Sequence, residues 1–308
     1  MANPSRVIAV GEQESQNSLT RSVAPLPVAP PAGSRIPTRI IQTGKQRQLS
    51  LKQRAFATNV QLLNPGYNTC FFDNDDVERF VNREFPEHRP TFDAFAFPIQ
   101  RYDFFRYLAV YRLGGFYLDL DVLLTSGLSG LSASGCVFPF EGLTFSRLLR
   151  DAGMDWEIGN YAFGAAAGHL FLEAVIENCV RAQRDPSWVR PMMRGVPPLS
   201  RADHYVLYTT GPGILSRTLA ENPTLASTVT VLFPEDVCEP QSWNQFGTLG
   251  VHVMEGTWRR RTSVFRRRLA QHWEAWAMER RLRESRRRGP TRSITPCLLP
   301  SSSRVARD

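Results

Sequence analysis

The sequence has no apolar run of the ~18 residues that a membrane-spanning helix requires. Its N-terminal residues lack both a cationic start and a hydrophobic stretch, so we expect no secretory signal peptide. Cysteine is scarce: the five in 308 residues are isolated and form no CxxC pair, which argues against a zinc site or a disulfide framework. These absences leave localisation undecided between the cytoplasm and a peripheral position on a membrane.

Most of the chain carries no net positive charge, and the excess of positive charge is concentrated at its end. Residues 259–308 hold 15 Arg against four acidic residues, a net charge of +11, so residues 1–258 carry −3 of the total of +8. A polyanion-binding core would instead spread Lys and Arg over a binding face. No nucleic-acid-binding motif accompanies the basic tail, and we therefore expect no specific nucleic-acid partner.

Four segments follow one another along the chain. Residues 1–34 are rich in Ser, Gln, Pro and Ala and cannot form a core, which predicts a disordered leader. Residues 35–262 alternate strand and helix patterns, as is typical of an α/β fold with a largely parallel sheet. Residues 263–285 predict a basic amphipathic helix, and residues 286–308 predict a disordered Arg-rich tail.

The most informative segment is a predicted helix over residues 98–113, followed by a glycine pair and a predicted strand over residues 116–124. Along that strand Tyr117, Asp119 and Asp121 share one face, because side chains two apart project the same way. Two neighbouring carboxylates repel each other, and a hard divalent cation such as Mn²⁺ or Mg²⁺ relieves that repulsion. A bare D-x-D triplet, however, is more often a pair of ordinary solvent-facing acids.

The preceding helix adds a second polar pair. Asp103 and Arg106 lie three residues apart, hence on one helix face, and the glycine turn returns this face onto the strand that carries Asp119. A carboxylate and a guanidinium are the groups that bind sugar hydroxyls beside a metal. Taken alone, the pair is better explained as a structural ion pair. The whole string PIQRYDFFRYLAVYRLGGFYLDLDV is far more specific than its parts.

This string resembles the DXD-containing sugar-binding region of glycosyltransferase family 32, which includes α-1,6-mannosyltransferases and capsular polysaccharide transferases. More distantly, it is similar to the clostridial glucosylating toxins. The resemblance runs from about residue 36 to residue 258. Further motifs match in the family's order: Ile41-Gln42-Thr43, Asn64-Pro65-Gly66-Tyr67, Asn160, Thr210-Gly211-Pro212, and His252 followed by Gly256-Thr257-Trp258.

The resemblance implies an α/β GT-A fold, a UDP- or GDP-sugar donor, a Mn²⁺ or Mg²⁺ cofactor and retention of anomeric configuration. It assigns the metal to Asp119, Asp121 and His252. The donor-binding residues that it implies are Gln42, Thr43, Asp103, Arg106, Tyr117, Asp119, Thr257 and Trp258. The catalytic residues that it implies are Asp103, Arg106, Asp121 and Asn160.

We therefore expect a hexosyltransferase that moves mannose, glucose or galactose to a glycan or glycolipid. One alternative is a protein-modifying glycosyltransferase, and another is an inert scaffold that keeps the sugar-nucleotide fold without turnover. A metal-dependent phosphohydrolase would call for more ligands around a second metal, and the sequence offers no such set. His252, taken alone, is equally well explained as a satisfied core histidine.

The predicted C-terminal helix carries an aromatic stripe. Phe265, Leu269, Trp273 and Trp276 fall along one side and arginines surround them. Such a stripe either packs onto the catalytic body or contacts an anionic membrane surface as a peripheral anchor. Packing onto the body is the favoured interpretation.

Overall fold

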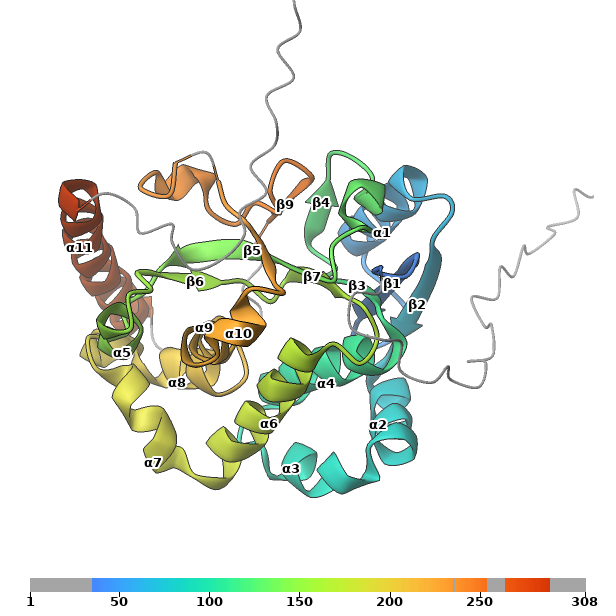
Figure 1. Cartoon of the computed structure of the whole chain (residues 1–308), viewed down its shortest axis with the longest axis horizontal. Coiled ribbons are helices and arrows are strands. Elements are labelled where there is room, and N and C mark those ends of the chain that lie inside the picture. Colours follow the sequence, from blue (N-terminus) through green and yellow to red (C-terminus); the bar gives the residue numbers. More distant parts are fainter. Residues whose placement is uncertain (1–34, 235, 254–263, 289–308) are drawn as a thin grey trace, which may run out of the picture.

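The computed structural model describes residues 35–234, 236–253 and 264–288. Within them a seven-stranded sheet runs through the centre in the order β2–β1–β3–β7–β5–β6, and β8 also pairs with β5 (Figure 1). Strands β1, β2, β3, β5 and β8 run in one direction, whereas β6 and β7 run in the opposite one. The predicted α/β class with a mostly parallel sheet is therefore confirmed. No helix in the described ranges is both long and apolar enough to cross a bilayer.

The elements have the following bounds. The strands are β1 (Arg39–Thr43), β2 (Asn68–Phe72), β3 (Gly115–Leu118), β4 (Val122–Leu124), β5 (Cys136–Leu143), β6 (Trp156–Ile158), β7 (Ala162–Ala165), β8 (Thr230–Leu232) and β9 (Gly250–His252). The α-helices are α1 (Leu51–Leu63), α2 (Asn74–Glu84), α3 (Arg89–Ala94), α4 (Pro98–Leu113), α5 (Arg147–Asp151), α6 (Leu170–Arg184), α7 (Pro186–Val189), α8 (Arg201–Thr209), α9 (Pro212–Glu221), α10 (Pro223–Ala226) and α11 (Val264–Arg288). The 3₁₀ helices are η1 (Pro86–His88), η2 (Leu128–Leu131), η3 (Arg190–Met193), η4 (Pro198–Ser200) and η5 (Pro240–Ser242).

Local sequence signals set the ends of the helices that flank the site. α1 begins after Ser50, whose Oγ accepts a hydrogen bond from the backbone N–H of Gln53 at 3.3 Å, and Asp73 caps α2 in the same way. α4 ends at Gly114, where φ is +62° and a Cβ would lie 2.8 Å from the ring of Pro37. Only glycine fits such a position without strain, so the chain turns directly from α4 into β3.

Two hydrophobic cores lie on opposite faces of the sheet (Figure 1). Helices α4, α6 and α9 contribute to the first, and α1 and β4 contribute to the second. Strand β3 supplies both, because Tyr117 enters the first core while Phe116 and Leu118 enter the second. The polar Asp119 therefore emerges directly from a strand that is buried on both faces.

The predicted continuous strand over residues 116–124 was wrong. β3 ends at Leu118, after which the backbone N–H of Asp119 donates to the carbonyl of Tyr161 at 2.8 Å. The N–H of Val122 then donates to the carbonyl of Asp119 at 3.1 Å and closes a turn. β4 pairs with β9 outside the main sheet. The physical reason is this change of partner strand, which local alternation of apolar residues does not reveal.

The predicted C-terminal helix is present as α11, but it docks through a different face from the one expected. Leu269, Trp273 and Trp276 are 41%, 50% and 62% exposed, so the interpretation that this stripe packs onto the body was wrong. Arg281 and Leu282 are buried instead. The Arg281 guanidinium pairs with the carboxylate of Asp155 and donates a hydrogen bond to the backbone carbonyl of Thr144. Such charge-assisted contacts orient the helix.

Glu157 on β6 makes a pH-dependent contribution to stability. Its buried carboxylate accepts hydrogen bonds from the Thr144 hydroxyl at 2.5 Å and the Tyr208 hydroxyl at 3.3 Å. Burial raises the pKa of Glu157 from 4.5 to about 7, so the folded protein retains a proton that the unfolded chain releases. The free energy of unfolding should therefore fall as pH rises, by about 2–3 kcal/mol between pH 5 and pH 8.

Glu157→Gln is expected to remove the contribution of Glu157 to this pH dependence, because a neutral amide keeps a hydrogen-bonding oxygen without the buried charge. Urea unfolding measured at several pH values tests the expectation. Glu279→Gln is the matched control, since the Glu279 side chain is 50% exposed. If wild type and Glu157→Gln lose stability in parallel between about pH 5 and pH 8, the buried carboxyl is not protonated in the folded protein.

Candidate active site

Two carboxylates and an imidazole meet where the DXD motif leaves the sheet. Asp119 follows β3, Asp121 lies in the turn before β4, and His252 ends β9 opposite Val122. One ligand atom from each of the three residues lies within 4.8 Å of the others. His252 Nε2 lies 3.2 Å from Asp121 Oδ1, and the ring of Tyr161 stacks on the imidazole with centroids 4.4 Å apart. The predicted metal residues are thus brought together.

The donor atoms of this group suit a divalent cation. Burial disfavours the charged imidazole, but the hydrogen bond with Asp121 and the negative charges of the nearby carboxylates together outweigh it, so the pKa of His252 is raised. His252 Nδ1 is buried and has no hydrogen-bond partner among the described residues. Two carboxylates together with one imidazole fit Mn²⁺, and the carboxylate oxygens also suit Mg²⁺.

A buried polar network lies behind the DXD motif, between α4 and the segment before β7. Arg106 Nη2 lies 3.0 Å from Asp103 Oδ1, and Arg106 Nη1 donates to the carbonyl of Asn160 at 2.7 Å. The amide of Asn160 donates to Asp103 Oδ1 at 3.1 Å, and the Thr210 hydroxyl donates to Asp103 Oδ2 at 3.0 Å. Asp103 and Arg106, three apart on α4, therefore do share one helix face, as the sequence predicted.

The charges in this network are coupled. Burial raises the pKa of Asp103 to about 6, although the neighbouring Arg106 lowers it. Burial also disfavours the Arg106 guanidinium, but the carboxylates of Asp119 and Asp103 raise its pKa above the ordinary value. Arg106 Nη1 lies 3.4 Å from Asp119 Oδ2. One guanidinium thus connects the buried acid to the acid of the DXD motif.

Tyr117 connects the end of β1 to the same motif. Its hydroxyl donates to Asp119 Oδ1 at 2.7 Å and lies 3.0 Å from the Thr43 hydroxyl. The guanidinium of Arg106 lies over its ring, 4.6 Å from the centroid. The side chain of Gln42 is buried, and its Nε2 has no hydrogen-bond partner among the described residues. The end of β1 therefore offers an unused donor near the motif.

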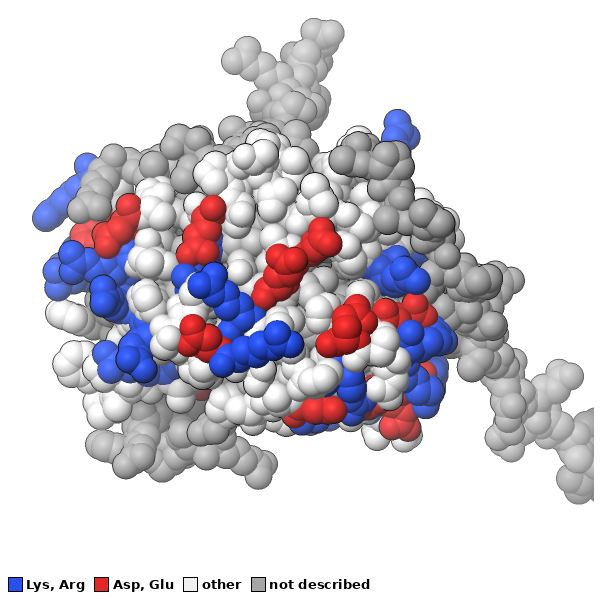
Figure 2. All heavy atoms as spheres, turned by 60° about the horizontal axis from the view of Figure 1, so that its bottom comes forward, with Lys and Arg blue, Asp and Glu red and all other residues white. Residues whose placement is uncertain are grey.

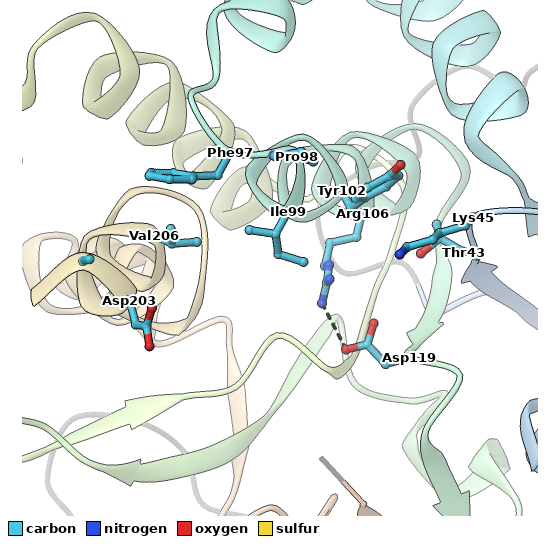
Figure 3. A pocket seen from close by; sticks show the side chains of 12 residues that line it. Thr43, Lys45, Phe97, Pro98, Ile99, Tyr102, Arg106, Asp119, Asp203 and Val206 are labelled. Carbon is cyan, nitrogen blue, oxygen red and sulfur yellow. Dashed lines mark hydrogen bonds and ion pairs between the residues drawn. The ribbon is translucent and has the colours of Figure 1, made fainter. Parts of the chain in front are cut away.

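A cavity of about 470 Å³ opens beside these groups, a size suited to a small-molecule ligand (Figure 3). Arg106 and Asp119 project into it, Thr43 and Lys45 lie on the side of β1, and Asp203 lies on the side of α8. The other lining residues are mostly apolar: Gly44, Phe97, Pro98, Ile99, Tyr102, Ala202 and Val206. The cavity thus combines charged side chains on two opposite sides with a mostly apolar wall.

Some predicted residues fall outside the described part of the chain. These are Thr257, Trp258 and the side chain of Phe265, together with residues 1–34 and 289–308. Other residues belong to the site and were not assigned to it from the sequence: Lys45, Tyr102, Tyr107, Asp203 and Thr210. Tyr107 could have been assigned to the site from the sequence, because it follows Asp103 by four residues and therefore lies on the same face of the predicted helix. The position of Asp203 depends on long-range packing, for which the sequence holds no local signal.

Residues 50–137 match the family model described as the glycosyltransferase sugar-binding region containing the DXD motif. The chain therefore contains a DXD-type glycosyltransferase sugar-binding region, and the resemblance to family 32 is confirmed.

Curated relatives share this region. The chain is 29% identical over 150 residues to inositol phosphoceramide mannosyltransferase 3 of Schizosaccharomyces pombe. This alignment covers 47% of this chain and 38% of that protein. It is 32% identical over 191 residues to a mannosyl phosphorylinositol ceramide synthase of Saccharomyces cerevisiae. That alignment covers 62% of this chain and 43% of the synthase. The match thus spans less than half the length of both relatives. Among solved structures, the PaToxG glycosyltransferase aligns with a TM-score of 0.42 and 15% identity over 61% of this chain and 70% of that one.

Proposed function

We propose that this protein is a metal-dependent, retaining glycosyltransferase that moves a hexose from a nucleotide-diphospho-sugar to a glycan or glycolipid. The observation that carries the proposal is the convergence of Asp119, Asp121 and His252 within 4.8 Å beside a cavity that Arg106 and Asp119 line. A diphosphate requires positive charge, and a sugar requires polar groups that recognise its hydroxyls. Both kinds of group are present around one cavity.

The metal-binding role falls to the carboxylates and the imidazole. Asp119, Asp121 and His252 would hold Mn²⁺ or Mg²⁺. When bound, the cation would act as a Lewis acid that stabilises negative charge on the departing nucleotide diphosphate. The hydrogen bond between Asp121 and His252, together with the stacked Tyr161 ring, orients these two side chains before any ligand arrives.

The sugar and nucleoside would bind on either side of Arg106. Because Arg106 faces the cavity and Asp103 lies behind it, we assign sugar or phosphate contact to Arg106. Asp103 and Asn160 then act as positioning residues, and direct contact of Asp103 with the sugar stays a prediction. Gln42 and Thr43 lie at the carboxyl end of β1, where α/β sheets bind nucleotides. They are assigned to the nucleoside.

The stereochemical proposal is attack from the face that the nucleotide leaves. A double displacement would need a carboxylate beside the anomeric carbon. Among the described residues that line the cavity, the carboxylates are Asp119 and Asp203. Asp119 already contacts Arg106 and Tyr117, and Asp203 lies on the opposite side of the cavity (Figure 3). We therefore assign the acceptor's proton to the departing phosphate.

The names of the relatives favour mannose as the transferred sugar and an inositol-containing lipid as the acceptor. A panel of UDP- and GDP-sugars, incubated with the protein and Mn²⁺, tests the proposal by nucleotide release and by equilibrium binding. The expected result is that one donor binds and turns over, and that EDTA abolishes turnover. Binding without turnover would call for an acceptor screen. If no donor binds with any metal, the inert-scaffold alternative replaces the transferase proposal.

A further inference from the structure

The outward face of α11 carries a cluster of large apolar side chains. Leu269, Trp273 and Trp276 follow one another at helical spacing and are 41%, 50% and 62% exposed. The two indole rings meet edge to face, with centroids 6.1 Å apart. Exposed apolar side chains scattered singly are ordinary on protein surfaces, but a cluster of them marks a contact surface.

The same face continues toward the C-terminal end of the helix as a row of arginines. Arg280, Arg283 and Arg287 follow Trp276 at spacings of four, three and four residues, and all three are exposed. Arg280 pairs with Glu284 and Arg283 pairs with Glu279, each at 3.2 Å. α11 nevertheless holds nine Arg against three Glu, a net charge of +6. Figure 2 has Lys and Arg gathered at the edge of the molecule that α11 occupies in Figure 1.

The opposite face of α11 is fixed to the body. Arg281 Nη2 lies 3.1 Å from Asp155 Oδ1, and Leu282 and Ser285 are buried. α11 also contacts α8, because His204 Nδ1 lies 3.8 Å from the carboxylate of Glu274. The tryptophans and the arginine row are therefore held on the outside of a helix that neighbours one wall of the cavity.

We propose that α11 is a peripheral docking helix for an anionic phospholipid bilayer. Trp273 and Trp276 would enter the headgroup region, where amphipathic indole rings partition, and the Arg280, Arg283 and Arg287 guanidinium groups would contact lipid phosphates. Charge complementarity favours this occupant, since aromatic side chains and Arg on one face of a cationic helix suit a negatively charged lipid surface. The proposal does not depend on the transferase activity. Docking through α11 would, however, bring the cavity close to a lipid-linked acceptor.

Vesicle co-sedimentation with the full chain tests the proposal. Phosphatidylcholine vesicles that also contain phosphatidylserine should bind the wild-type protein, and phosphatidylcholine alone should bind it far less. Trp273→Ala/Trp276→Ala should lower the vesicle partition constant at least about tenfold. Arg280→Gln/Arg283→Gln/Arg287→Gln should remove the preference for phosphatidylserine, because the charge attraction is lost.

Leu51→Ala/Leu62→Ala is the matched control. These two leucines on α1 are 77% and 74% exposed, so their removal deletes exposed apolar surface at a different place and should leave vesicle binding unchanged. Circular dichroism checks the fold of every variant. The proposal is overturned if wild type does not bind the anionic vesicles, or if the tryptophan variant binds them as wild type does. It is also overturned if size-exclusion chromatography shows that the tryptophan substitutions convert an oligomer into monomers, because the two rings would then form a contact between copies of the chain.

Discussion

Asp121→Asn is expected to reduce kcat/KM for the preferred donor by about 10³-fold, with Mn²⁺ affinity falling in parallel. The amide keeps the size of the side chain and an oxygen, but it removes one of the two negative charges that face the proposed cation. It also weakens the contact with His252 Nε2, now 3.2 Å from Asp121 Oδ1. Steady-state kinetics across a Mn²⁺ titration, with Mn²⁺ binding followed separately by electron paramagnetic resonance, measures both effects.

The interpretation depends on separating loss of the metal site from loss of the fold. Asp151→Asn is a suitable control, because Asp151 is 69% exposed in a surface pair with Arg147 and such pairs contribute little. Its activity and thermal midpoint should equal those of wild type. If Asp121→Asn keeps full activity and full Mn²⁺ affinity, the carboxylates of the DXD motif do not hold a catalytic metal and the proposed function fails in its central part.

The polar pair on α4 could be predicted from the sequence because every signal for it is local. Pro98 at the first turn and Gly114 at the end delimit the helix, and three-residue spacing places Asp103 beside Arg106. The structure has this helix over the predicted residues, with the two side chains 3.0 Å apart.

The remaining parts of the site depend on contacts between segments far apart in the sequence. The alternating pattern after Gly115 gives no sign that the chain changes partner at Asp119 and pairs with β9. His252 reaches Asp121 only through that pairing. Asp203 faces the cavity because α8 packs across it, and nothing in the sequence of α8 identifies that wall. Local periodicity determines which side chains share a face, whereas tertiary pairing determines which faces meet.

The docking of α11 illustrates the same distinction. Its aromatic stripe has the spacing of a core-facing stripe, and the expectation that it packs inward followed from hydrophobicity alone. The structure instead buries Arg281, whose guanidinium finds Asp155 at 3.1 Å, and leaves Trp273 and Trp276 outside. A buried arginine with a matched carboxylate cannot be foreseen without knowing where that carboxylate lies.

Removal of the Arg106 charge is expected to produce the largest loss of stability. Arg106→Met should lower the free energy of unfolding by about 3–5 kcal/mol, because it leaves the Asp103 carboxylate buried without its counterion. Asp103→Asn should cost markedly less. Arg106 keeps Asp119 at 3.4 Å and the Asn160 carbonyl at 2.7 Å in that variant, and the new amide can still bond to the Thr210 hydroxyl. Urea unfolding at pH 8, where the wild-type Asp103 carboxyl with its pKa of about 6 is ionised, measures both.

The double variant Asp103→Asn/Arg106→Met distinguishes electrostatics from packing. Once Asp103 is neutral, the loss of Arg106 no longer leaves an unpaired buried acid at that position. The double variant should therefore be more stable than Arg106→Met alone, a coupling of about 1–3 kcal/mol. Arg106→Lys should fall between wild type and Arg106→Met in stability. An ammonium keeps the charge, but it lacks the planar fork of donors with which the guanidinium reaches both carboxylates and the Asn160 carbonyl. Strict additivity of the two single changes would mean that Arg106 stabilises the site by filling space, with its charge playing no part. Arg106→Met should also lose transferase activity, because the Arg106 guanidinium both faces the cavity and contacts Asp119.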